Sequence, residues 1–75
     1  MQDVQHWVGK RIRTLREGRG VSQEQLADQC GMNRSHMGKI ERGEVNLGIA
    51  TLFAIMTKLE IDVFQFFNGI SSTKN

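Results

Sequence analysis

Several residue types and patterns on which other classes of protein depend are scarce or missing in this sequence. It has a single cysteine, Cys30, so no internal disulfide framework can form, and we expect this residue to be a small buried helix residue rather than a reactive thiol. No apolar run reaches the ~18–20 residues of a membrane-spanning helix, and no secretory signal is present. We therefore expect a cytoplasmic protein that does not associate with membranes.

Groupings of residues that would support catalysis or metal binding are also missing. The two histidines, His6 and His36, are isolated, and neither they nor the carboxylates show the spacing of metal ligands. No Ser/His/Asp, Cys/His or paired-carboxylate arrangement stands out. The sequence thus predicts a protein that is not an enzyme and holds no metal or cofactor.

The length of the chain, 75 residues, is enough for one domain with a modest core. We expect residues 1–75 to form a single domain whose core spans residues 6–68, followed by a frayed tail at residues 70–75. There is no room for a second domain that would bind a small-molecule effector, so no such effector is expected.

The charges are unevenly distributed, although the net charge is only +2. Residues 1–43 hold eight Lys or Arg against five Asp or Glu, whereas residues 44–75 hold two against three. The basic surplus therefore lies in the first part of the chain. This distribution is what an anionic partner such as nucleic acid requires.

Residues 22–43, SQEQLADQCGMNRSHMGKIERG, read as two short helices joined by a tight turn. Ser22 and Gln25 form a capping box for the first helix, and Asn33 is a good N-cap for the second. Gly31 stands where a helix end commonly needs a left-handed residue, and Gly43 closes the second helix. The inward positions are Leu26, Ala27, Cys30, Met37 and Ile40. This layout is that of a helix-turn-helix, whose second helix enters the DNA major groove.

The rest of the chain predicts three more helices and no strand. A helix from His6 to Glu17 has Val8, Ile12 and Leu15 on one face, with residues 1–5 outside it. A fourth helix follows the loop Asn46-Leu47-Gly48, with its buried face formed by Ile49, Leu52, Ile55 or Met56, and Leu59. Asp62 and Gln65 form a second capping box for a fifth helix that ends after Phe67. The sequence thus predicts an all-α domain of five short helices.

The run SQEQLA…G…NRSHMGKIERG resembles the helix-turn-helix of the phage-repressor-like, or Xre-type, transcriptional regulators, over residues 8–67. The resemblance implies a homodimeric regulator of double-stranded DNA. The C-terminal pattern, Asn-Leu-x-Ile…Leu-x-Ile-Met and then Val-Phe-x-Phe-Phe, resembles the narrower group of controller proteins of restriction–modification systems. A phage repressor, an antitoxin-type regulator, and a protein-interaction module that has lost DNA binding are the alternatives.

DNA contacts are expected from the second helix of the motif and from its surroundings. Arg34 can make a bidentate contact to guanine, with Ser35, Lys39 and Asn33 as further base contacts. Gly38 either allows a close approach to DNA or is tolerated at an exposed site. The expected phosphate contacts are Gln23, His36, Arg42, Asn46 and Arg11. For His36, helping to close the helix start is an equal alternative.

Two structural roles complete the sequence-based expectations. The resemblance implies that Arg16 pairs with Glu41, either as a buried ion pair whose disruption costs about 3–5 kcal/mol or as a surface pair worth roughly 0–1 kcal/mol. The fourth and fifth helices carry more apolar surface than one buried face can use. Such a surplus marks an interface, here that of a two-fold dimer. The expected interface residues are Ala50, Phe53, Ala54, Phe64 and Phe67.

Overall fold

The computed structural model describes the backbone of residues 2–68 and the side chains of residues 4–68. Residues 2–68 contain no strand, and the prediction of an all-α domain with five helices is confirmed. The tail predicted at residues 70–75 lies outside the described residues. The helices are α1 (Gln2–Gly18), α2 (Gln23–Gln29), α3 (Arg34–Glu41), α4 (Ile49–Lys58) and α5 (Val63–Phe67).

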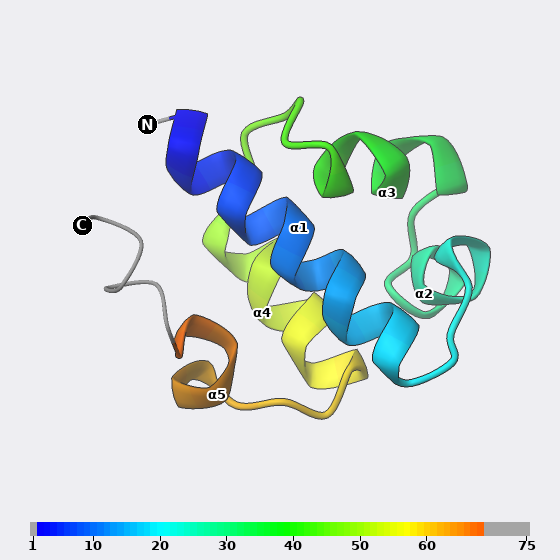
Figure 1. Ribbon diagram of the computed structural model, residues 1–75. Helices are drawn as coiled ribbons and strands as arrows, with labels where there is room; N and C mark the ends of the chain where they lie inside the picture. The colour runs from blue at the N-terminus through cyan, green and yellow to red at the C-terminus, as the bar shows by residue number, and fades with distance from the viewer. Residues whose placement is uncertain (1, 69–75) are drawn as a thin grey trace.

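The helices pack around one core that lies between α1 and α4. Figure 1 shows α1 running diagonally across the molecule in front of α4, with α2 and α3 together on one side and α5 on the other. The core residues come from all five helices and from the end of α4: Val8, Ile12, Leu26, Ala27, Met37, Ile40, Leu52, Ile55, Met56, Leu59 and Phe66. The helix-turn-helix unit is thus presented at one side of the domain and α5 at the other.

The start of α1 differs from the sequence-based prediction. Residues 2–5, expected outside the helix, are helical. The side chain of Gln5 explains why this first turn is held in place, because its amide nitrogen lies 3.3 Å from the carbonyl oxygen of Gly43 and 2.9 Å from that of Val45. These bonds fasten the beginning of α1 to the loop after α3. Their partners lie some 40 positions along the chain, so local sequence could not reveal them.

A glycine sets how closely α1 approaches α3. Gly9 is buried, and a Cβ atom at this position would lie 2.4 Å from the carbonyl oxygen of Ile40 and 2.6 Å from that of Glu41. Real Cβ atoms do not come so near to backbone atoms, so only glycine permits this packing. Gly9 therefore determines the spacing between the long first helix and the C-terminal end of α3.

The buried face predicted for α4 is correct except at its first residue. Leu52, Ile55, Met56 and Leu59 are buried as expected, whereas Ile49 is 85% exposed. Ile49 lies at the first position of α4, on the same side of the helix as Phe53, which is also exposed. Gly48 at the N-cap provides no side-chain hydrogen bond, in keeping with the absence of proline or a polar cap in this loop.

Candidate nucleic-acid interface

The turn between α2 and α3 has the local geometry that the sequence predicts. Ser22 accepts a hydrogen bond from the backbone of Gln25, whose side chain accepts one from the backbone of Ser22 in return. Gly31 has φ of 71°, and Asn33 caps α3 by accepting from the backbone N–H of His36 at 2.8 Å. Cys30 lies at the C-cap of α2 and is half-buried, where full burial was expected. These contacts fix how α3 leaves the turn.

A buried ion pair holds α3 against α1. The guanidinium of Arg16 donates from Nε to Oε2 of Glu41 at 2.7 Å and from Nη2 to Oε1 at 3.2 Å. The side chains are 10% and 2% exposed, so the pair predicted from the sequence is present and is the buried form. Hydrogen bonding to Glu41 raises the pKa of Arg16 further above its already high value.

The same ion pair extends to the start of α2. Oε1 of Glu41 also accepts from Nε2 of Gln23 at 2.9 Å, and Nη1 of Arg16 donates to the carbonyl oxygen of Val21 at 2.9 Å. Because a carboxylate only accepts hydrogen bonds, the amide of Gln23 is oriented with its nitrogen toward Glu41. One buried carboxylate therefore fixes α1, α3 and the first side chain of α2 relative to one another.

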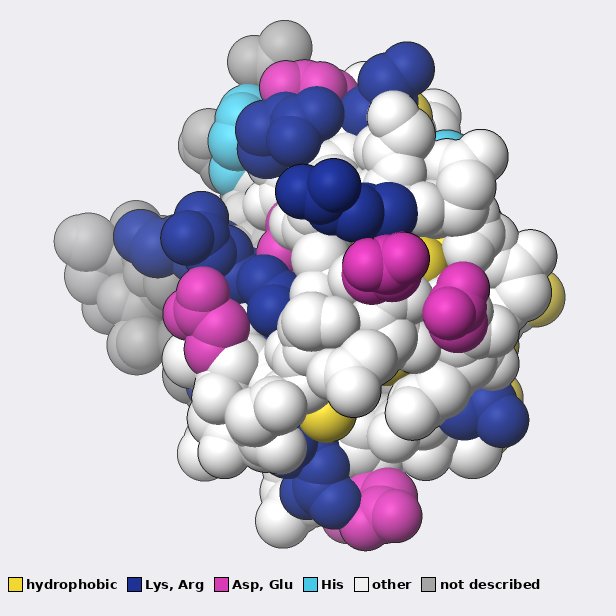
Figure 2. Space-filling view, turned by 90° about the vertical axis from the view of Figure 1, so that its right-hand side faces the viewer, with side chains coloured by type: hydrophobic (Ala, Val, Ile, Leu, Met, Phe, Trp, Pro, Cys, Tyr) yellow, Lys and Arg dark blue, Asp and Glu magenta, His cyan; other side chains and the backbone are white. Residues whose placement is uncertain are grey.

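The outward side of α3 carries polar and basic side chains. Arg34, Ser35, His36 and Lys39 are exposed, whereas Met37, Ile40 and Glu41 on the opposite side are buried. Figure 2 views this side of the molecule: Lys and Arg side chains gather over its upper half, where α3 lies, and hydrophobic side chains show only as small areas. The face is therefore suited to a hydrated anionic surface rather than to an apolar one.

A polar hollow of about 420 Å³ lies on this face between α2 and α3. Its lining consists of Gln23, Arg34, Ser35, Gly38 and Arg42. Gly38 forms the floor, since a Cβ there would lie 3.0 Å from Nη1 of Arg42 and 3.5 Å from Oε1 of Gln23. Gly38 is buried beneath these side chains, so it is not simply a glycine tolerated at an exposed site. The missing side chain makes room for Arg42 to lie back along α3.

Arg42 has a carboxylate partner that the sequence reading did not consider. Its Nε and Nη2 atoms donate to the two oxygens of Glu44, at 2.9 Å and 3.3 Å. The side chains of Arg42 and Glu44 are 58% and 50% exposed. The hydrogen bond from Arg42 holds the pKa of Glu44 below its usual value, with Lys39 and His6 adding to the effect. Asn46, in the same loop, is exposed.

Arg11, expected as a phosphate contact, lies on another side of α1 than the one that meets α3, and it has partners within the protein. It is two positions from Gly9, hence about 200° around α1 from the side that meets α3. Its Nε donates to the carbonyl oxygen of Phe66 at 2.9 Å and its Nη2 to that of Gln65 at 2.7 Å. Arg11 therefore binds the last carbonyls of α5 and fastens that helix to α1.

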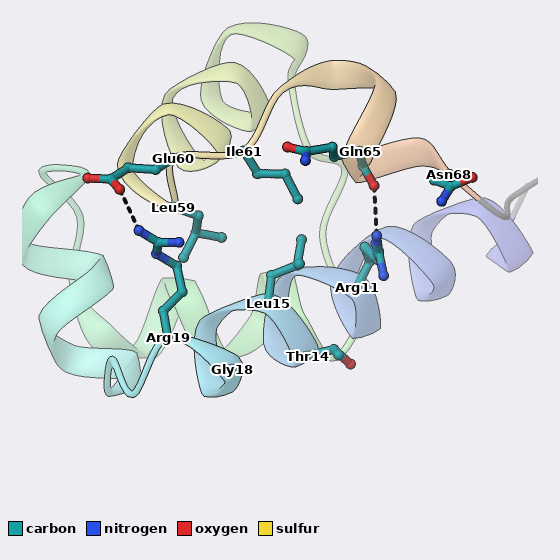
Figure 3. A pocket seen from close by; sticks show the side chains of 10 residues that line it. All are labelled: Arg11, Thr14, Leu15, Gly18, Arg19, Leu59, Glu60, Ile61, Gln65 and Asn68. Atoms are coloured by element: carbon teal, nitrogen blue, oxygen red, sulfur yellow. Dashed lines mark hydrogen bonds and ion pairs between the residues drawn. The ribbon is translucent and has the colours of Figure 1, made fainter.

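The surroundings of Arg11 form a second hollow, of about 530 Å³. Figure 3 shows it closed at one end by the contact of Arg11 with Gln65 and at the other by the ion pair of Arg19 with Glu60. Leu15, Leu59 and Ile61 lie between the two ends. Both arginines are thus engaged by the protein itself, and the hollow lies across α1 from α3.

Apolar side chains are exposed on α4 and at the start of α5. Phe53 is 60% exposed and Phe64 is 90% exposed. Phe67, also expected at the interface, is half-buried, and its ring stacks on Trp7 with centroids 6.0 Å apart. We call the exposed and half-buried apolar residues of α4 and of the start of α5 the α4–α5 patch: Ile49, Ala50, Phe53, Ala54, Val63 and Phe64.

The described residues contain neither a metal site nor a membrane span. No group of three or more His, Cys, Asp or Glu side chains among them is placed to hold a metal ion. None of the helices between residues 2 and 68 combines the length and the apolar character needed to cross a bilayer.

Comparison with known proteins agrees with the geometry of α2 and α3. Residues 7–62 match the family described as a helix-turn-helix domain. The chain therefore belongs to the helix-turn-helix family of DNA-binding transcriptional regulators. The match covers all of α2, α3 and α4 and most of α1.

Individual relatives include control proteins and a phage repressor. The control protein C.SmaI of Serratia marcescens is 33% identical over 61 residues, which is 81% of this chain and 73% of that protein. The immunity repressor of Bacillus phage phi105 is 39% identical over 56 residues, 75% of this chain but only 39% of the repressor. The solved structure of the restriction–modification controller protein C.Esp1396I, as a tetramer in complex with its natural 35 base-pair operator, is similar with a TM-score of 0.80 and 33% identity, covering 89% of this chain and 88% of that one.

Proposed function

We propose that the protein is a regulator of the restriction–modification controller type, which binds a pseudo-palindromic DNA operator as a homodimer and is not an enzyme. The observation that carries this proposal is the construction of α3. Its inner side is held by the buried pair of Arg16 and Glu41, and its outer side presents basic and polar side chains beside a polar hollow. A helix supported in this way is suited to enter the major groove.

Base reading is assigned to the exposed side of α3. Arg34 contacts guanine through its two terminal nitrogens, and Ser35 and Lys39 contact neighbouring base edges. Asn33 takes a smaller part, because its side-chain Oδ1 already accepts a hydrogen bond from the backbone of His36 and is held at the cap of α3. Phosphate contacts are assigned to side chains around this helix: Gln23, His36, Arg42 and Asn46.

Dimer formation is assigned to the α4–α5 patch. The side chains of Phe64 and Phe53 present exposed apolar area that a second copy of the chain would cover. A two-fold axis through this patch sets two copies of α3 side by side, and half-sites in DNA about 34 Å apart then match the two helices. The C.Esp1396I controller protein, which is bound to its operator as a tetramer, supports an assembly of more than one chain.

Regulation by such a protein follows from its concentration in the cytoplasm. Dimer formation and operator binding are linked equilibria, so occupancy of the operator rises steeply as the protein accumulates. Neither a cofactor nor a small-molecule effector is needed for this response.

Selection of bound sequences from a random duplex pool, at two salt concentrations, tests the proposal. We expect an inverted repeat with half-sites one helical turn apart, and an affinity that falls as salt rises. Weak binding without any enriched sequence would contradict it and favour a protein-interaction module instead.

Two variants assign the parts of the interface. Arg34→Ala should weaken operator binding by about 1–3 kcal/mol and relax the preference at one base position. Phe53→Asp should leave the fold intact and shift the protein to monomer in sedimentation experiments. An unchanged base preference in the first case, or an unchanged dimer in the second, would remove that residue from its assigned role.

A further inference from the structure

The ion pair of Arg42 with Glu44 lies on the face that we assign to DNA. Arg42 is the C-cap residue of α3, and its guanidinium lies back over Gly38 in the polar hollow that Arg34 and Ser35 also line. Glu44 follows two residues later and takes two of the three guanidinium nitrogens. The carboxylate of Glu44 therefore accepts the hydrogen bonds of Arg42 that a DNA phosphate would otherwise accept.

The geometry of this pair resembles that of an arginine bound to phosphate. Planar guanidinium groups bind carboxylate and phosphate oxygens alike through two parallel N–H···O bonds. Glu44 satisfies both of these bonds, at 2.9 Å and 3.3 Å, and leaves only Nη1 above Gly38. Lys39, on the outer side of α3, also lowers the pKa of Glu44, so the carboxylate lies close to a basic side chain of the interface.

We infer that Glu44 is an affinity-determining residue that masks Arg42 from the DNA backbone, an inference that rests on the proposed DNA-binding function. The free protein keeps Arg42 neutralised by its own carboxylate, so one phosphate contact is weakened in every complex. Phosphates are the same in all sequences, so the masking lowers affinity for operator and non-operator duplexes alike. Base reading by Arg34 then contributes a larger share of the total binding.

Because the pair of Arg42 and Glu44 is exposed, a single substitution can remove the masking without unfolding the domain. At side-chain exposures of 58% and 50%, the pair contributes little to folding, so its loss leaves the domain intact. Replacing Glu44 by glutamine keeps the shape of the side chain and removes its charge. Arg42 is then available to a phosphate, and the anionic group that repels the DNA backbone is gone.

The matched control is Glu60→Gln. Glu60 is also an exposed carboxylate paired with an arginine, Arg19, and its replacement changes the net charge by the same amount. It lies at the hollow on the other side of α1, away from α3 (Figure 3). Any difference between the two variants therefore reports the position of the carboxylate and not the total charge.

The test measures dissociation constants of the wild type, Glu44→Gln and Glu60→Gln for the selected operator and for a scrambled duplex, over a series of salt concentrations. For Glu44→Gln we expect about 1.5- to 5-fold tighter binding to both duplexes, the factor that corresponds to one exposed ion pair. The slope of log K against log salt should steepen by about 0.9, the change for one added phosphate contact. Glu60→Gln should change both quantities much less.

Three results would overturn the inference. If Glu44→Gln behaves as Glu60→Gln does, the pair lies outside the interface. If Glu44→Gln binds more weakly, Glu44 positions Arg42 instead of masking it. If Glu44→Gln tightens binding as much in an Arg42→Ala background as in the wild type, Arg42 is not the group that is masked. A wild type that binds neither duplex would instead contradict the proposed function itself.

Discussion

Replacing Glu41 with alanine measures how much of the stability of the domain depends on one buried carboxylate. The substitution leaves the guanidinium of Arg16, only 10% exposed, without its hydrogen-bonded carboxylate and with only the half-exposed Glu17 at 3.9 Å. It also leaves the amide of Gln23 without its acceptor. Removing one partner of a buried pair costs about 3–5 kcal/mol. A domain of this size is stable by roughly 4–11 kcal/mol, so the variant should lose a large part of its stability.

Urea unfolding followed by far-UV circular dichroism gives the free energy directly, and thermal unfolding should show a fall in Tm of roughly 12–40 °C. The control is Arg13→Ala, which breaks the exposed pair of Arg13 with Glu17 within α1 and should cost no more than about 0.5 kcal/mol. A loss below about 1 kcal/mol for Glu41→Ala would show that burial does not govern this pair and would refute the reasoning.

A double variant separates the energy of the pair from the penalty of an unpaired charge. Arg16→Met combined with Glu41→Leu removes both charges and keeps apolar volume at both positions. Such replacements are often neutral or stabilising, so the double variant should be clearly more stable than Glu41→Ala alone. Recovery should be incomplete, because the carbonyl oxygen of Val21 loses the donor that Arg16 supplies.

Three further predictions concern single residues. Gly9→Ala should destabilise the domain by about 1–3 kcal/mol in urea unfolding, because its Cβ would meet the carbonyl oxygen of Ile40 at 2.4 Å, whereas Gly18→Ala, with nothing within 4 Å, should be close to neutral. Glu60 has φ of 58° after the end of α4, so Glu60→Gly should raise the melting temperature, with a gain of about 0.5–1 kcal/mol; a fall would mean that the ion pair with Arg19 outweighs the strain. Burial raises the pKa of the Cys30 thiol, so this thiol should react with Ellman's reagent near pH 8 more slowly in the native than in the unfolded protein. For the same reason the contribution of Cys30 to stability should decline as the pH rises above the ordinary cysteine pKa of about 8.5. Equal rates in the two states would contradict that direction.

The features that the sequence predicts correctly are those set by neighbouring residues. Both capping boxes, the Asn33 cap and the left-handed Gly31 depend on groups within a few positions, and the structure contains all of them. Helix periodicity likewise identifies most of the core, since it needs only the spacing of apolar residues. The pair of Arg16 and Glu41 was found through family resemblance and not through local pattern.

The features that the sequence did not reveal depend on contacts between distant segments. The first turn of α1 is held by the hydrogen bonds of Gln5 to the loop after α3, and Arg11 donates to carbonyl oxygens of α5. Ile49 fits the apolar spacing of α4 but lies on a side that no other helix covers in the described part of the chain. Nothing in the sequence near Gly9 indicates a close helix approach, because the opposing carbonyls come from positions 40 and 41.

The division of α3 into an inner and an outer side also bears on how such a protein evolves. Met37, Ile40 and Glu41 hold the helix, whereas the side chains of Arg34, Ser35 and Lys39 form no hydrogen bond or ion pair with any residue that the structure describes. Under the assignment of base contacts proposed above, mutations at the outer positions change the recognised sequence without disturbing the fold. Under the same assignment, operator and regulator are able to diverge together, one base and one side chain at a time, while the packed inner side of α3 keeps the helix in place.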